Sequence, residues 1–183
     1  MKTLKLIFLL FGSALLLLCS QCKKNDHSPP LTELQKLPAI TQAGRNTFGC
    51  LINGKAFKPG GGGILTNVLS ARYDPTQGGL FSINAKYYFA DNSRQFINLG
   101  TIGVNAPGTY ILQLHSPYVI SYAHSTSYCD FNTWNDTPIS GTLIITRFDT
   151  NPGIISGTFS FKAATAACGT IEGADGRFDV TCR

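Results

Sequence analysis

The chain has 183 residues, of which only 14% are charged, well below the usual quarter. The formal net charge of +5 comes from dispersed basic residues rather than a basic stripe, so the composition argues against nucleic-acid binding. Gly, Ser, Thr and Asn are abundant, which is typical of short strands joined by turns and predicts an all-β protein.

The first element is an apolar run over residues 6–19, which follows two lysines. Its 14 residues fit the hydrophobic region of a signal peptide and fall short of the about 20 that a membrane-spanning helix needs. We expect residues 1–21 to be a lipoprotein signal peptide and Cys22 to be the first mature, lipid-modified residue. Cys19 is the other candidate for lipidation, and secretion without lipid is the alternative. Removal of the leader takes away two of the 15 basic residues, which leaves 13 against 10 acidic ones and a net charge of +3.

Residues 22–44 contain three prolines, few large side chains and no sustained periodicity. We interpret this segment as a flexible, lipid-anchored tether. The alternative is that Leu31, Leu34 and Leu37, spaced three apart, form a short helical turn that docks on the domain and ends at Pro38.

Residues 45–183 predict a single antiparallel all-β domain of about nine to ten strands. Phe48, Cys50 and Ile52 alternate with other residues, and Asn53-Gly54 then supplies the two residues of a type I′ hairpin turn. Further strands are expected at 64–73, 81–89, 95–102, 109–115, 119–123, 141–148, 154–163 and 177–182. The pattern fits a β-sandwich or an up-and-down barrel-like domain and does not separate the two.

Four cysteines of the domain form an even set, which predicts disulfides in an oxidising compartment. A three-residue hairpin loop at 174–176 would place Cys168 opposite Cys182, at a distance that suits a disulfide. Cys50 with Cys129 follows by elimination. The chain has no Cys-x-x-Cys pair and the cysteine spacings are irregular, so we do not expect zinc.

Catalytic motifs of hydrolases and phosphate-binding loops do not occur in the chain, so we expect neither an enzyme nor a cofactor. His115 is predicted to lie on the surface or edge of a strand, and His124 in a solvated loop. Two acidic stretches, residues 130–136 and 172–179, are candidates for calcium sites. In the first, Trp134 occupies the third ligand position and no glycine follows; in the second, turn chemistry explains Asp175 without metal. We therefore predict no metal site. These stretches are Asp130, Asn132, Asn135 and Asp136, and Glu172, Asp175 and Asp179.

Five aromatic residues within seventeen positions form the best candidate for a binding site: Tyr118, Tyr122, Tyr128, Phe131 and Trp134. Exposed aromatic rings beside amides and carboxylates can stack on sugar faces, and they also form protein-interaction hot spots. We predict that this loop binds a glycan or an envelope protein. The alternative is that some of these rings fill the end of the domain.

The run Cys-Lys-Lys-Asn-Asp after a leucine-rich leader resembles lipoprotein signals of Bacteroidetes. Residues 46–59, 155–162 and 175–180 look like segments of uncharacterised lipoproteins from the same bacteria. The resemblance covers most of the mature chain and implies an address and a fold, but no activity.

The first functional hypothesis is a lipid-anchored, non-catalytic protein of the bacterial cell envelope that binds a ligand or partner. Its expected location is the outer membrane, on the periplasmic or the surface face. A structural or assembly accessory of an envelope complex is the alternative, followed by a small hydrolase.

Overall fold

The computed structural model describes residues 29–113, 119–124, 129–132 and 139–182. Within them, eleven strands form two antiparallel sheets of six and five strands, and neither sheet closes into a barrel. The predicted all-β fold is confirmed, and its form is a sandwich. The helices of the described residues are short 3₁₀ turns, none of which is long and apolar enough to cross a membrane.

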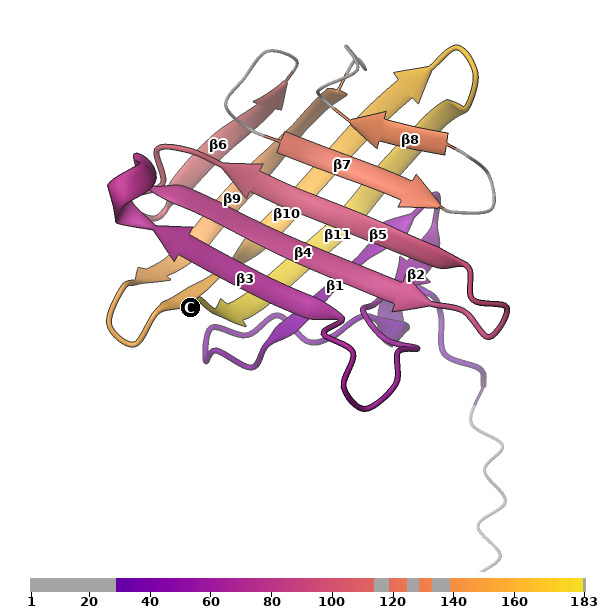
Figure 1. Cartoon of the computed structure of the whole chain (residues 1–183), viewed down its shortest axis with the longest axis horizontal. Coiled ribbons are helices and arrows are strands. Elements are labelled where there is room, and N and C mark those ends of the chain that lie inside the picture. The colour runs from indigo at the N-terminus through magenta and orange to yellow at the C-terminus, as the bar shows by residue number, and fades with distance from the viewer. Residues whose placement is uncertain (1–28, 114–118, 125–128, 133–138, 183) are drawn as a thin grey trace, which may run out of the picture. The chain divides into compact units, whose positions relative to one another are not determined.

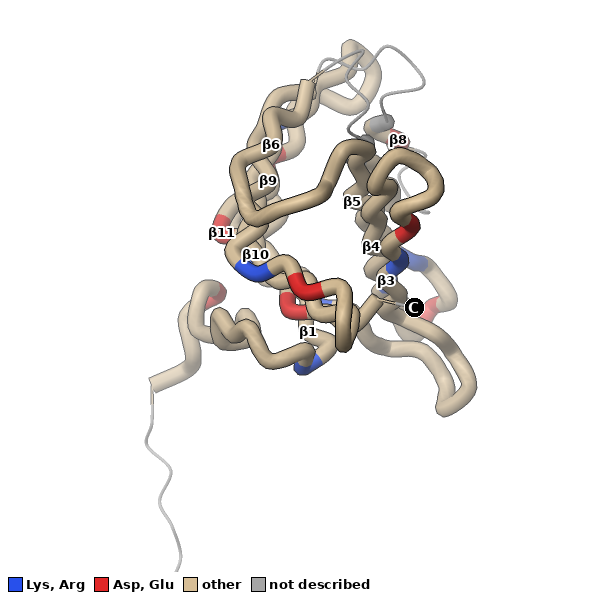
Figure 2. The backbone as a smooth tube through the Cα atoms, turned by 90° about the vertical axis from the view of Figure 1, so that its left-hand side faces the viewer, with Lys and Arg blue, Asp and Glu red and all other residues tan. Residues whose placement is uncertain are grey.

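The six-stranded sheet has the order β2-β1-β11-β10-β9-β6, and the five-stranded sheet has the order β3-β4-β5-β7-β8. Figure 1 views the five-stranded sheet face-on, and Figure 2, turned by 90°, shows the two sheets as separate layers. The bounds in chain order are β1 (Thr47–Ile52), β2 (Lys55–Phe57), β3 (Leu69–Asp74), β4 (Leu80–Tyr88), β5 (Arg94–Thr101), β6 (Gly108–Gln113), β7 (Val119–His124), β8 (Cys129–Asn132), β9 (Ile139–Asp149), β10 (Ile154–Thr165) and β11 (Gly169–Thr181), with 3₁₀ turns η2 (Leu34–Lys36) and η3 (Pro75–Gln77).

Aromatic rings join the two sheets at the centre of the core. Phe81 of β4 lies 5.8 Å, between ring centroids, from Phe178 of β11. Phe178 is 6.5 Å from Phe159 of β10, which stacks on Phe48 of β1 at 5.1 Å. All four rings are buried. Their strands alternate buried and more exposed residues because successive side chains point to opposite faces of a sheet.

The β1–β2 hairpin is confirmed as the sequence predicts. Asn53 and Gly54 have φ angles of 47° and 78°, the two left-handed residues of a type I′ turn. The Asn53 side-chain oxygen also accepts a hydrogen bond of 2.8 Å from the backbone N–H of Glu172. The turn is therefore tied to β11 as well as to its own hairpin.

The hairpin predicted at residues 174–176 is wrong, because β11 runs as one strand of thirteen residues. Asp175 does have a left-handed backbone, with φ of 52°. At this point the pairing of β11 shifts register against both neighbours, between Gly49 and Leu51 on β1 and between Phe159 and Phe161 on β10. The same backbone geometry that would turn a hairpin here produces a β-bulge inside a continuous strand.

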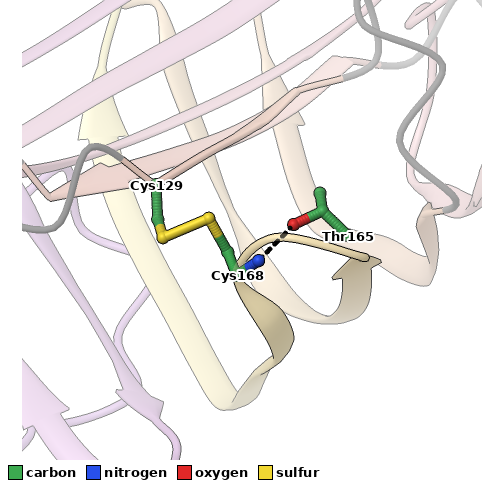
Figure 3. The surroundings of a disulfide bond; sticks show 3 residues. All are labelled: Cys129, Thr165 and Cys168. Atoms are coloured by element: carbon green, nitrogen blue, oxygen red, sulfur yellow. Dashed lines mark hydrogen bonds between the residues drawn. A yellow bond between two sulfur atoms is a disulfide. The ribbon is translucent and has the colours of Figure 1, made fainter.

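The predicted disulfide pairs are therefore also wrong. Cys168 lies in the β10–β11 turn and Cys182 just beyond the other end of β11, roughly 45 Å along an extended strand. Cys168 instead forms a disulfide with Cys129 at the start of β8, with a Cα–Cα distance of 5.7 Å (Figure 3). The Thr165 hydroxyl oxygen accepts a hydrogen bond of 3.0 Å from the Cys168 N–H. The disulfide links the two sheets at one end of the sandwich.

Cys50 and Cys182 are free thiols. Cys50 is fully buried on β1, and burial raises its pKa to about 12. Burial likewise raises the pKa of Cys182 to about 11. Both thiols are therefore protonated at neutral pH and behave as core side chains rather than nucleophiles.

The compact unit begins at Leu31, not at Arg45 as the predicted boundary of the tether implies. The segment before β1 docks on β11 through Asp179, whose side chain is 1% exposed. Five donors reach this carboxylate at 2.6–3.1 Å: the hydroxyls of Thr41 and Ser156 and the backbone N–H groups of Ala43, Gly44 and Arg45. We call this contact the Asp179 clasp. Periodicity does not reveal it because backbone amides make most of the contact.

The short helical turn that we weighed as the alternative to a flexible tether is present at η2. Thr32 and Gln35 cap it reciprocally: the Gln35 N–H donates to the Thr32 hydroxyl and the Thr32 N–H donates to the Gln35 side chain. Leu37 is buried, whereas Leu31 and Leu34 are exposed. The turn docks through Leu37 and through Glu33, which accepts a hydrogen bond of 2.8 Å from the Ala56 N–H.

The disulfide generates the first prediction. Replacing Cys168 by Ser should lower the free energy of unfolding by about 4 kcal/mol, because the bridge closes a loop between residues 39 apart in sequence. Urea unfolding under oxidising conditions measures the change, and Cys182→Ser serves as the control that leaves the bridge intact. A non-reducing peptide map that links Cys168 to Cys182 would contradict the observed pairing.

The Asp179 clasp generates the second prediction. Replacing Asp179 by Asn should lower the free energy of unfolding by roughly 2–4 kcal/mol. Each carboxylate oxygen accepts hydrogen bonds from at least two donors, so in either orientation the NH₂ group of Asn would face N–H or O–H donors instead of an acceptor. Urea titration at pH 7 measures the loss. Asp91→Asn, in the exposed β4–β5 turn, is the matched control.

The same clasp predicts a pH dependence. Burial acts to raise the pKa of Asp179, but its hydrogen bonds outweigh burial and hold that pKa well below the ordinary value of 3.8. The unfolded chain therefore binds a proton near pH 4 that the folded chain does not, so stability falls as pH drops below about 4. The loss should be smaller in Asp179→Asn than in the unsubstituted protein. Equal slopes for the two proteins between pH 5 and pH 2 would show that the clasp does not carry this dependence.

Candidate functional site: a lysine–aromatic pocket

Two of the five predicted ligand-binding aromatics lie in the core. Tyr122 on β7 is 7% exposed and Phe131 on β8 is 3% exposed, and their ring centroids are 6.3 Å apart. These two rings fill the domain, as the alternative interpretation has it, and do not form an exposed platform. Tyr118, Tyr128 and Trp134 lie outside the described residues, as does His115.

A row of four side chains that carry polar groups or sulfur crosses the inner face of the five-stranded sheet, near the end that the disulfide links to the other sheet. Tyr87, Gln95, His124 and Cys129 are consecutive cross-strand partners on β4, β5, β7 and β8. They share the face of the buried residues Ala85 and Ile97 of the same strands, because side chains two residues apart point the same way. His124 thus ends a strand in this row instead of lying in a solvated loop, where the sequence had placed it.

Tyr122 holds the amide of this row in place. The Gln95 amide N–H donates a hydrogen bond of 3.1 Å to the Tyr122 hydroxyl oxygen. Burial raises the pKa of Tyr122, the hydrogen bond from Gln95 opposes the rise, and nearby Cys50 adds to it. The phenol is therefore neutral at physiological pH and positions Gln95 without ionising.

An open cavity of about 340 Å³ lies beside Tyr87 and Gln95. Its lining combines cationic, aromatic and amide side chains from four elements of the fold. The residues are Lys36, Ala56, Phe57, Lys58, Tyr87, Phe89 and Gln95, which we call the lysine–aromatic pocket.

Contacts between rings hold the aromatic side chains of the pocket in place. Tyr87 and Phe89 meet edge to face at a centroid distance of 4.8 Å, and Phe89 lies 5.6 Å from the His124 ring. Phe57 of β2 is buried and contacts Phe48 of the core edge to face at 6.3 Å. These contacts hold the aromatic lining of the pocket against the core.

The charged side of the pocket comes from Lys36 of η2 and Lys58 after β2. Lys36 forms an exposed ion pair of 2.5 Å with Glu33. Within the part of the chain that the structure describes, Lys58 forms no ion pair with an acidic residue. The pocket therefore offers an ammonium group to an incoming anion.

Three other cavities in the described part of the chain have different linings: one combines Asp175, Arg177 and Phe159, and another combines Tyr73 and Asp149. A larger cavity of about 410 Å³ between β3 and the end of β11 is lined by neither charged nor aromatic side chains. No group of three or more His, Cys, Asp or Glu side chains within the described ranges could hold a metal ion. Asp179, weighed above as a calcium ligand, is saturated by protein donors. The first calcium candidate falls partly outside the described residues.

Sequence reasoning missed the pocket because its halves are far apart in the chain. The lysines belong to a presumed tether and to the exit of a short hairpin, and each is ordinary in its local context. The sequence pattern placed Tyr87 and Gln95 on two predicted strands but gave no sign that they contribute to one site. Of the five predicted aromatics, Tyr122 reaches the pocket indirectly, through its hydrogen bond with Gln95.

No curated protein and no solved structure matches the chain. A family model described as a domain of unknown function (DUF6252) matches residues 87–179, just over half of the chain. The matched region contains Tyr87, Phe89 and Gln95 of the pocket and both cysteines of the disulfide, whereas Lys36 and Lys58 precede it. The chain belongs to the DUF6252 family.

Proposed function

We propose that this protein is a non-catalytic binding protein that takes an acidic saccharide into the lysine–aromatic pocket. The observation that carries the proposal is the joint lining of one cavity by two lysines, three aromatic rings and an oriented amide. A sugar carboxylate would pair with Lys58, a pyranose face would stack on Tyr87 or Phe89, and Gln95 would hydrogen-bond a hydroxyl. The pocket thus meets each chemical group of a uronic acid with a matching side chain.

The absence of an activated nucleophile at the pocket favours binding over hydrolysis. A nucleophile needs a base within hydrogen-bond reach. Among the described residues, two base candidates lie near the pocket lining: Glu33, whose carboxylate is already bonded to Lys36 and the Ala56 N–H, and His124, which contacts Phe89. The row that holds His124 presents a phenol, an amide and a disulfide sulfur. These groups can orient and bind a ligand, and the lining includes no pair of carboxylates of the kind that most glycoside hydrolases use.

The address of the protein is part of the same proposal. The apolar leader, Cys22 and the basic residues after it support export and lipid anchoring in the cell envelope of a Bacteroidetes-type bacterium, with the outer membrane as the expected site. The disulfide between Cys129 and Cys168 is in keeping with an oxidising compartment. In this location a binding protein would meet polysaccharide fragments.

An assembly accessory is the second candidate function. It is favoured by two exposed isoleucines, Ile111 at 50% and Ile144 at 39%, on the edge strand β6 and its neighbour β9. An edge strand with exposed apolar side chains can pair with another chain. The pocket binding assay below separates the two functions, because an accessory has no need of a saccharide.

A glycan array probed with the full chain tests the pocket. We expect binding to oligosaccharides that contain uronic acids, and at least a tenfold loss of affinity in Lys58→Gln and in Phe89→Ala, since one lost charged or stacking contact is worth about 1.4 kcal/mol or more. Lys162→Gln, which removes an exposed lysine of β10, is the control and should bind normally. Binding that survives both pocket substitutions, or that is restricted to neutral glycans, would contradict the proposal.

Mass spectrometry of the protein from its native membrane tests the anchor. We expect the mature chain to begin at Cys22 with a mass increase that corresponds to acylation. The Cys22→Ser variant should lose the added mass. An unmodified Cys22, or an N-terminus at another residue, would refute lipid anchoring at this position.

A further inference from the structure

Two apolar side chains stand fully exposed at the tip of the loop that joins β2 to β3. Ile64 and Leu65 are 104% and 100% exposed relative to an extended reference, more than any other large apolar residues among those described. The Thr66 N–H donates a hydrogen bond of 2.8 Å to the Gly63 carbonyl oxygen, which closes a four-residue turn. Ile64 and Leu65 occupy its two corner positions.

The base of this loop is fixed to the five-stranded sheet. The Gly60 N–H donates to the Lys86 carbonyl and the Tyr88 N–H donates to the Gly60 carbonyl, both at 3.0 Å. On the returning side, the Lys86 N–H donates to the Val68 carbonyl at 2.8 Å. A Cβ at Gly61 would lie 1.8 Å from the Tyr88 carbonyl oxygen, so only glycine fits there. The tip is therefore held away from the sheet by an anchored stalk.

The residues at the tip contradict the chemistry of an ordinary solvent-exposed turn. Turn corners favour Gly, Pro, Asn, Asp and Ser, whereas this turn carries Ile and Leu. The four glycines before it provide no side chains against which the two could pack. Residues that depart from the usual turn preferences, as Ile64 and Leu65 do, are expected at functional positions.

The charges around the base of the loop are mainly positive. Lys58 precedes the loop, and the backbone of Lys86 forms hydrogen bonds with Gly60 and Val68 at the two ends of the loop. Lys36 shares a cavity with Lys58, and the neighbouring acid Glu33 is already paired with Lys36. On the adjacent β4–β5 turn, Asp91 is matched in charge by Arg94. The tip is thus apolar and its surroundings carry a net positive charge.

We propose that Ile64 and Leu65 insert into the interfacial region of a lipid bilayer with anionic headgroups, while the lysines at the base of the loop face those headgroups. Apolar side chains at a projecting tip with basic residues behind them match the two layers of such a membrane surface. Figure 1 shows the loop projecting beyond the lower edge of the two sheets. The inference does not depend on a ligand in the lysine–aromatic pocket.

A bilayer fits this loop better than a protein groove does. A protein partner that buried the tip would need a deep pocket of its own, and the glycine stalk offers it almost no side-chain surface to contact. A bilayer needs only apolar side chains at the correct depth and cations near the phosphates.

Fluorescence quenching by brominated lipids tests the proposal at the level of single positions. The full chain is prepared with Cys22→Ser and Trp134→Phe, and with Leu65→Trp as its only tryptophan. The vesicles contain phosphatidylethanolamine and phosphatidylglycerol at about three to one, with bromine on the upper acyl chain. We expect a blue shift and at least a twofold quenching of the tryptophan at position 65.

Two controls make the result specific to the loop. A tryptophan introduced by Ile111→Trp on β6, in the same background, reports on a surface of the six-stranded sheet and should not be quenched. Lys86→Gln should reduce the quenching at position 65 and leaves every residue of the pocket lining unchanged. Equal quenching at positions 65 and 111, or none at position 65, would overturn the proposal. Neither outcome bears on saccharide binding, which the glycan array measures separately.

Discussion

The Asp179 clasp is the contact on which the arrangement of the N-terminal half depends. β11 lies between β1 and β10, and Asp179 near its end accepts hydrogen bonds from the segment before β1 and from Ser156 of β10. One carboxylate thereby fixes where the chain enters the six-stranded sheet. That entry point sets the position of β1, and the hairpin turn at Asn53 and Gly54 then sets the position of β2.

The pocket is a consequence of that placement. β2 contributes Phe57 and is followed by Lys58. The turn η2 contributes Lys36 and is held to β2 by the hydrogen bond that the Ala56 N–H donates to Glu33. The opposite side comes from the five-stranded sheet through Tyr87 and Gln95. At the same end of that sheet the disulfide between Cys129 and Cys168 crosses from one sheet to the other. Neither sheet alone could form the cavity, so its geometry depends on the contacts that hold the two together.

Local patterns predicted the fold well and long-range contacts poorly, for physical reasons that particular residues show. Alternation and the turn residues Asn53 and Gly54 depend on near neighbours, so the strands and the first hairpin were predictable. Asp175 was ambiguous because a left-handed residue serves a hairpin and a bulge equally well, and the choice depends on pairing with β1 and β10. The error at Asp175 then spread to both disulfide pairs. The pocket was not predictable because it joins residues 36 and 95 through packing that no local pattern encodes.

The lysine–aromatic pocket and the β2–β3 loop meet at one short stretch of chain. Lys58 lines the pocket, and Gly60, two residues later, is the first anchored residue of the loop. A bilayer contact at Ile64 and Leu65 would therefore hold the pocket close to the lipid headgroups, so that ligands would reach it from along the membrane surface. Both the charged half of the pocket and the loop precede the region that defines the family, whereas the aromatic and amide half lies within it. In the proposed function, the family region would supply the surface on which a sugar ring stacks, and the preceding segment would supply the charge and the membrane contact.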